Sequence, residues 1–195
     1  MPTIATAHPT TRGRSYQLAR RSGRSLAYCA TLLPVAVFTL VTVPLGGAGP
    51  AVARWRGLRT GLLDMPPTAV PGRRPGRIAV LGHALLSLLV GAVAVLPLGV
   101  EVLMVLRGML YGLVDPGPYD NSWGGPTRAG AWVAHFLVGL PLAAAGLAAL
   151  VGIALVHQRL TRSLDGERSP RWLLPTLLLM AAAGTALFVA WTHQI

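Results

Sequence analysis

The sequence contains no lysine and only one cysteine, and charged residues make up 12% of its 195 residues. Soluble domains carry about 25% charged residues, whereas 53% of the residues here are hydrophobic. This composition excludes an ordinary soluble domain. Cys29 has no second cysteine to pair with, which excludes an internal disulfide and a cysteine-based zinc site. We expect Cys29 to be a small buried residue.

Familiar catalytic patterns are missing as well. The sequence shows no Ser-His-Asp set, no HExxH motif and no pair of acidic residues at catalytic spacing. We therefore expect a protein that is not an enzyme and that holds no cofactor or metal. The 17 basic residues are all arginines, and they do not interleave with aromatic residues in the manner of a nucleic-acid-binding surface. A nucleic-acid partner is not expected.

Four hydrophobic regions dominate the chain, and a helix needs about 20 apolar residues to cross a bilayer. The regions are Leu26–Val52, Ile78–Val114, Ala129–Val156 and Trp172–Trp191. The sequence thus predicts an all-α, multi-pass helical bundle in the cell membrane. The last region is an additional C-terminal transmembrane helix within residues 167–195.

The arginines outside these regions predict how the chain is oriented. Five lie in residues 1–24, which we expect to be a disordered tail, and ten lie in the linkers 53–77 and 157–171. Cytoplasmic segments of membrane proteins are enriched in arginine. If the first region enters the membrane and returns on the same side, the tail and both linkers are cytoplasmic and only Arg128 lies outside. Prolines and glycines such as Pro34, Pro44 and Gly46 favour this re-entrant hairpin. A single tilted span is the alternative.

The second hydrophobic region is too long for one crossing, because 37 helical residues would extend roughly 55 Å. We expect a kink at Pro97, after which Val100–Val114 projects outward or lies along the outer interface. Gly125 and Pro126 are expected to begin the third helix, with proline at its first position. The loop 115–127 is then extracytoplasmic.

This loop is the most polar segment between two hydrophobic regions. Its tyrosine, tryptophan, aspartate and asparagine side chains have two interpretations. They either form a turn and anchor at the level of the lipid headgroups, or they form an ordered outer lid that binds a ligand, a lipid headgroup or a partner domain. The candidate residues of this lid are Asp115, Tyr119, Asp120, Asn121, Trp123 and Trp132.

Three ionisable residues inside hydrophobic regions are further candidates, since such residues are costly in a membrane. Glu101 and Arg107 are about 240° apart on a straight helix, so they would not pair directly. They either extend to the outer interface, or Glu101 is buried against the third helix and senses protons or cations. His135 lies close to the loop and is a candidate for titration with external pH. For His83 we expect packing or a hydrogen bond between helices.

One part of the sequence is distinctive. The string "LYGLVDPGPYDNSWGGPTRAGAWVAHFLVGLPL", which starts at Leu110, and the later string "HQRLTRSLDG" resemble the membrane-embedded sensor domain that actinobacteria place at the N-terminus of many histidine kinases. The resemblance is strongest over Leu110–Gly166 and weaker over residues 26–109. It implies a sensor-like membrane domain at residues 25–166 whose first part is a two-helix hairpin.

The chain departs from that family after residue 166, where another hydrophobic helix replaces the dimerisation helix of a kinase. The resemblance therefore implies a non-catalytic signal-input or accessory protein that passes a membrane or envelope signal to a separate partner, such as a histidine kinase or another membrane protein. A small permease-like or export-accessory subunit of a transporter is the alternative. Faces of small residues leave a homodimer open.

Overall fold

The computed structural model describes residues 11–65 and 74–193, and these residues form helices with no strand among them. The all-α prediction is confirmed. The elements are α1 (Thr11–Thr42), α2 (Ala48–Leu63), α3 (Arg77–Leu103), the π-helix η1 (Met104–Met109), α4 (Tyr111–Val114), α5 (Arg128–Arg162), the 3₁₀-helix η2 (Ser163–Asp165) and α6 (Leu173–Thr192).

Four of these helical segments are long and apolar enough to cross a membrane. They are Ser15–Thr42, Arg77–Met109, Arg128–Asp165 and Leu173–Ala190. The shortest has 18 residues, which corresponds to about 27 Å of helix and is close to the thickness of a bilayer core. The chain thus fits a multi-pass membrane protein in a lipid bilayer.

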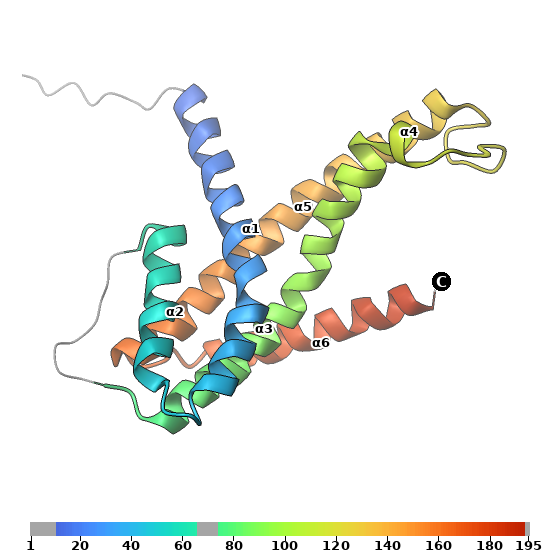
Figure 1. Ribbon diagram of the computed structural model, residues 1–195. Coiled ribbons are helices and arrows are strands. Elements are labelled where there is room, and N and C mark those ends of the chain that lie inside the picture. The colour runs from blue at the N-terminus through green and yellow to red at the C-terminus, as the bar shows by residue number, and fades with distance from the viewer. Residues whose placement is uncertain (1–10, 66–73, 194–195) are drawn as a thin grey trace, which may run out of the picture.

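The first hydrophobic region folds as a helical hairpin. The chain reverses at residues 43–47, and α2 returns beside α1 (Figure 1). Gly46 has a φ of 99°, which favours glycine, and a side chain on Gly47 would come within 2.8 Å of the Thr42 carbonyl oxygen. The reversal agrees with the predicted hairpin, and α1 by itself is also long and apolar enough, at Ser15–Thr42, for the alternative of a single tilted span. Pro34 lies inside α1 without ending it.

The hairpin is longer at both ends than the sequence predicts. Residues 11–24 were expected to be a disordered tail, but they belong to α1, and residues 53–63 of the linker 53–77 belong to α2. Arg24 explains both differences, because it forms an ion pair with Asp64 and donates to the Gly61 carbonyl oxygen at 3.1 Å. These contacts join the start of α1 to the end of α2. The remaining parts of the two predictions, residues 1–10 and 66–73, lie outside the described residues.

The second hydrophobic region continues through Pro97 as one helix to Leu103. Its departure from α-helical geometry comes later, at η1, where six residues form a π-helix. The third helix begins at Arg128 with Thr127 as its N-cap, two residues after the start expected from Gly125 and Pro126. The Thr127 hydroxyl accepts a hydrogen bond from the Gly130 amide at 3.1 Å, which satisfies a first-turn donor better than proline at that position could.

The packed core lies where α1, α2, α3 and α5 meet. Fully buried side chains from each helix fill it, among them Leu32, Trp55, Val90 and Leu150. From this core α3 and α5 run out together as an arm that carries the loop at its tip, and α6 packs on α3 (Figure 1). The core and the tip of the arm are therefore the two ends of one pair of antiparallel helices.

Candidate functional site

A cluster of polar and aromatic side chains is buried in the core. We call it the buried polar cluster, and its members come from α1, α2, α3, α5 and η2. They are Tyr28, Trp55, Arg56, Arg59, His83, Ser87, His157 and Asp165. All except Arg56 are less than 5% exposed. Since polar groups are costly to bury without partners, the contacts of this cluster determine how the four helices fit together.

Asp165 is the centre of the ionic part of the cluster. Its Oδ1 accepts from Arg56 Nε and its Oδ2 from Arg59 Nη2, both at 2.6 Å. Arg56 also donates to the Leu164 carbonyl oxygen at 3.2 Å. The two arginines are three residues apart on α2, so they lie on the same face. One carboxylate therefore fixes α2 to the C-terminal end of α5.

His157 is the centre of the neutral part. Tyr28 Oη lies 2.8 Å from His157 Nδ1, and Ser87 Oγ lies 2.8 Å from His157 Nε2. Ser87 itself donates to the His83 carbonyl oxygen at 2.7 Å. The serine proton is thus already used, so His157 Nε2 donates to Ser87 and Nδ1 accepts from Tyr28. The neutral ring satisfies both of its nitrogens and ties α1, α3 and α5 together.

His83 lies beside this network without joining it. Its ring meets Trp55 edge to face at a centroid distance of 5.1 Å and lies 5.5 Å from the His157 ring. Neither of its ring nitrogens has a hydrogen-bond partner among the described residues, and the same holds for Trp55 Nε1. His83 thus packs between helices, as expected, but makes no hydrogen bond to another helix with its ring. Buried polar groups left without partners are rare and often mark functional sites.

A second cluster lies at the tip of the arm. We call it the loop cluster, and it consists of Tyr111, Tyr119, Trp123, Trp132 and His135. The His135 ring stacks on Tyr111 at a centroid distance of 4.2 Å, and Trp123 covers it at 6.2 Å. Trp132 Nε1 donates to the Gly108 carbonyl oxygen at 3.0 Å, which joins the start of α5 to the π-helix η1.

The polar residues of the loop order its backbone. Asp115 Oδ1 accepts from the Gly117 amide at 3.1 Å, and Tyr119 Oη donates to the Asp115 carbonyl oxygen at 2.6 Å. A turn closed by the Ser122 amide on the Tyr119 carbonyl oxygen, at 2.9 Å, has Asp120 and Asn121 at its centre. The side chains of these two residues are exposed. They occupy the turn positions that the sequence indicated.

Two cavities open beside the loop cluster. One, of about 160 Å³, is lined by Arg107, Trp123 and His135 together with apolar residues of η1 and α5. The other, of about 190 Å³, is also lined by Arg107 and is bounded by Tyr111 and Asp115. The structure therefore brings Arg107 and His135, which the sequence singled out separately, to the wall of the same cavity.

Glu101 lies farther along the arm, toward the core. Its Oε1 is buried without a hydrogen-bond partner in the described residues, and it faces Gly146 of α5, where a side-chain carbon would lie only 2.5 Å from it. Glu101 makes no ion pair with Arg107 in the described part of the chain. Glu101 thus contacts the third helix, as one sequence-based alternative expected, but only one of its carboxyl oxygens is buried and the residue as a whole is half-buried.

Most of the buried polar cluster was not singled out from the sequence. Arg56 and Arg59 were counted as linker charges, and Trp55, Ser87 and Asp165 were not identified. The string "HQRLTRSLDG" starts with His157 and contains Asp165, so it held the one available signal: an acidic residue and a histidine at the end of a hydrophobic region. No group of three or more metal-ligating side chains occurs within residues 11–65 and 74–193.

Comparisons of the chain with protein-family models, with curated proteins and with solved structures give no match. The two clusters and the helices that join them are therefore the features that indicate a function.

Proposed function

We propose that the protein is a non-catalytic signal-input protein of the membrane, in which a change at the loop cluster is passed through α3, η1 and α5 to the buried polar cluster. The hairpin of α1 and α2 then presents the change to a separate partner, such as a histidine kinase. The sequence resemblance to actinobacterial sensor domains supports the same role.

The observation that carries this proposal is the placement of both clusters on α5. His135 belongs to the loop cluster and His157 to the buried polar cluster, and 22 residues separate them on one continuous helix. This spacing corresponds to roughly 33 Å, close to the thickness of the bilayer core. The two clusters thus lie about one membrane thickness apart on a single helix.

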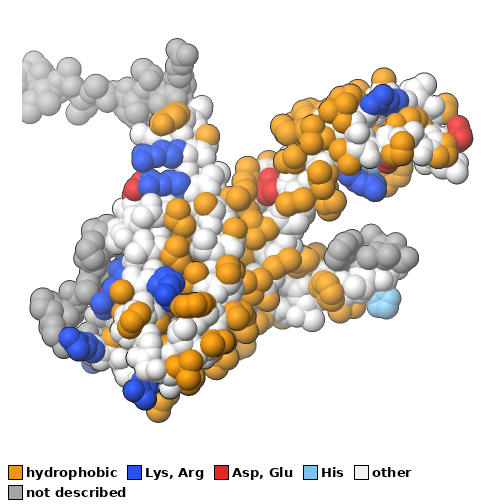
Figure 2. Space-filling model, viewed as in Figure 1, with side chains coloured by type: hydrophobic (Ala, Val, Ile, Leu, Met, Phe, Trp, Pro, Cys, Tyr) orange, Lys and Arg blue, Asp and Glu red, His pale blue; other side chains and the backbone are white. Residues whose placement is uncertain are grey.

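The surface supports an orientation with the loop outside. Figure 2 shows arginine side chains over the α1–α2 end of the molecule and again at the tip of the arm, with hydrophobic surface along much of the arm between them. The larger number of arginines belongs to the α1–α2 end and the segments that adjoin it, and cytoplasmic segments are the ones enriched in arginine. This orientation places the partner on the cytoplasmic side and the loop outside.

The π-helix η1 is the element through which the loop acts in this proposal. π-Helical turns are rare in proteins overall, and those that occur are often found at functional sites. Trp132 is bonded to η1 through the Gly108 carbonyl oxygen, and Met104, the first residue of η1, lies directly after the turn that contains Glu101. A change of η1 toward α-helical geometry rotates the part of the helix on one side of it relative to the other. The buried Glu101 carboxyl against Gly146 then moves with respect to α5.

The proposal is tested by measuring whether the two ends are coupled. Spin labels at Gly57 on α2 and Gly152 on α5, in a Cys29→Ala background, report the distance between the helices that the buried polar cluster joins. Both positions are exposed, and a side chain at either meets nothing within 4 Å. The measurement is pulsed electron paramagnetic resonance on the full chain in nanodiscs.

The perturbation is Trp132→Phe, which removes the hydrogen bond to Gly108 and keeps an aromatic ring. We expect the distance distribution between the two labels to shift or broaden. The matched control is Trp172→Phe, at a half-exposed tryptophan next to α6, and it should leave the distribution unchanged. Superimposable distributions for wild type and Trp132→Phe would show that the ends are not coupled and would remove the proposal.

A further inference from the structure

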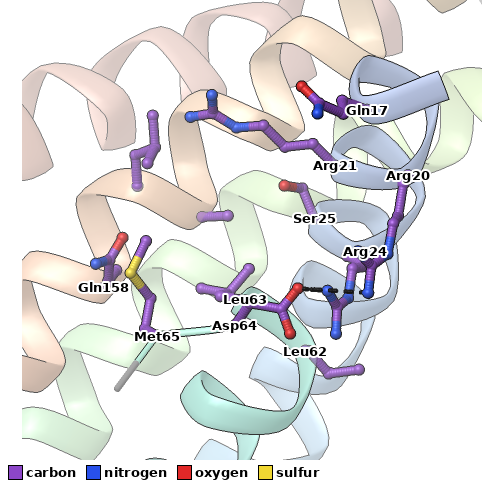
Figure 3. A pocket seen from close by; sticks show the side chains of 12 residues that line it. Gln17, Arg20, Arg21, Arg24, Ser25, Leu62, Leu63, Asp64, Met65 and Gln158 are labelled. Atoms are coloured by element: carbon purple, nitrogen blue, oxygen red, sulfur yellow. Dashed lines mark ion pairs between the residues drawn. The ribbon is translucent and has the colours of Figure 1, made fainter. Parts of the chain in front are cut away.

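A cavity of about 380 Å³ lies between the first half of α1, the end of α2 and α5 (Figure 3). Neither the loop cluster nor the buried polar cluster includes it. Its α1 wall is formed by Gln17, Arg20, Arg21 and Arg24. These residues have the spacing of one helical face, at positions i, i+3, i+4 and i+7, so the sequence itself places three guanidinium groups on the same side of α1.

The charge of the cavity is positive. Its one acidic residue, Asp64, forms ion pairs with Arg24 and, at 3.7 Å, with Arg20. Asp64 ends α2 with a φ of 53° and a ψ of 32°, a left-handed conformation that aspartate tolerates better than most residues. Three guanidinium groups and one carboxylate leave a net charge of two positive, and the Asp64 contacts hold Arg20 and Arg24 at the side of the cavity.

Arg21 is the arginine available for a ligand. It makes no hydrogen bond or ion pair with any other described residue. Figure 3 shows its side chain reaching from α1 across the cavity toward α5. A guanidinium group in this position presents its planar fork of donors to an anion, and carboxylate and phosphate oxygens both match that fork.

Neutral donors lie deeper in the same cavity. Ser25 of α1 is 3% exposed and Gln158 of α5 is 4% exposed, and the side chain of neither makes a hydrogen bond within the described parts of the chain. Leu62, Leu63 and Leu155 complete the lining with apolar surface. A hydroxyl, an amide and a guanidinium group around an apolar floor suit a ligand that has both a phosphate group and an apolar part.

The cavity lies near the ends of two candidate membrane spans. The span of α1 begins at Ser15, and Arg21 and Arg24 follow within its first three turns, while Gln158 lies within two turns of Asp165, where the span of α5 ends. Basic pockets between transmembrane helices near the membrane surface bind anionic lipid headgroups. We propose that this cavity binds the phosphate group of an anionic membrane phospholipid, with Arg21 as its main charged contact. The cavity is lined by the same hairpin and by α5, but lipid binding there does not require the proposed signal path.

The experiment is native mass spectrometry of the full chain released from nanodiscs that contain equal amounts of phosphatidylglycerol and phosphatidylcholine. We expect wild type to retain phosphatidylglycerol preferentially. Arg21→Gln should lower this retention about fivefold, the scale of one basic side chain near a membrane surface. Arg21 is exposed and has no partner to lose among the described residues, so the variant should keep the thermal stability of wild type.

Arg159→Gln is the matched control, because Arg159 is exposed, adjoins Gln158 and does not line the cavity. It should change retention less than twofold. Gln158→Leu removes a donor without changing the charge and should lower the preference for phosphatidylglycerol over phosphatidylcholine. Equal loss in the two arginine variants, or equal retention of the two lipids by wild type, would overturn the proposal.

A competition arm separates lipid from soluble phosphate. Glycerol 3-phosphate at millimolar concentration should leave the bound phosphatidylglycerol in place, because it lacks the acyl chains that the apolar floor contacts. Displacement of the lipid by glycerol 3-phosphate at an equal concentration would show that the cavity recognises a soluble phosphate ester and would overturn the lipid assignment.

Discussion

The substitution Asp165→Asn tests the ionic part of the buried polar cluster most directly. The amide keeps the shape of the side chain and removes its negative charge, which two guanidinium groups contact at 2.6 Å. Arg59 is 1% exposed, so water cannot replace the lost carboxylate there. Arg56 is 27% exposed along its side chain and can turn toward water. The main cost of the substitution therefore falls on Arg59.

The size of this cost follows from the behaviour of buried ion pairs. Removing one partner of such a pair destabilises a protein by roughly 3 to 5 kcal/mol, because a charge stays buried without its counter-charge. For chains of 150 to 250 residues, each kcal/mol lowers the melting temperature by about 2 to 4 °C. We therefore expect Asp165→Asn to lower the melting temperature by roughly 6 to 20 °C.

The assay is thermal unfolding of the full chain in mild detergent, followed by intrinsic tryptophan fluorescence, since Trp55 is a buried member of the cluster. Glu167→Gln is the matched control. It removes the same charge two residues away, where the contact with Arg162 is long, at 3.7 Å, and exposed to solvent. Exposed pairs contribute about 0 to 1 kcal/mol, so this variant should melt close to wild type. Equal melting temperatures for Asp165→Asn and Glu167→Gln would refute a central role for Asp165.

Three further substitutions test the packing of the helices. Gly91→Ala should lower the free energy of unfolding by about 1 to 3 kcal/mol, because the new carbon would lie 3.0 Å from the backbone nitrogen of Leu33 in α1. Gly82→Ala, where nothing lies within 4 Å, should instead stabilise α3 by up to about 1 kcal/mol; a similar loss in both variants in thermal unfolding would contradict the close contact of α1 and α3. Trp132→Phe should cost about 1 kcal/mol through loss of the bond to Gly108, and hydrogen exchange of η1 should increase, while unchanged exchange would show that this bond does not hold η1.

The helices that are long and apolar enough to span a membrane were predictable because their signal is local. A run of apolar residues long enough to cross a bilayer defines its own helix, since every backbone group must be hydrogen-bonded within the segment. The same rule explains why α1 continues through Pro34, where the sequence favoured a turn, and why α3 continues through Pro97, where the sequence favoured a kink. Breaking the helix would expose more backbone groups to lipid than one proline leaves without a partner. The reversal at residues 43–47 has glycine at positions that need it, and it was predictable for that reason.

The loop was predictable in part. Tyr119, Asp120 and Asn121 indicate a turn by residue type, and the turn forms there. The contacts that make the loop a cluster depend on other elements. Trp132 bonds to a carbonyl oxygen 24 residues earlier, and the donor needs the irregular backbone of η1 to meet it. A π-helix has no clear signature in a single sequence, so neither this bond nor the cavity beside Arg107 could be predicted.

Arg59 shows why the distribution of charges along the chain predicts where helices end but not which residues the charged side chains contact. The distribution of arginines along the chain assigns residues 53–77 to one side of the membrane and treats each arginine there as exposed to water. The partner of Arg59 is 106 residues away in the sequence and is one of only six acidic residues. Nothing near position 59 distinguishes this arginine from Arg54 or Arg56. The contact between Arg59 and Asp165 exists only because α2 folds back along α1 and meets the end of α5. The buried ion pair therefore depends on the hairpin and cannot be predicted without it.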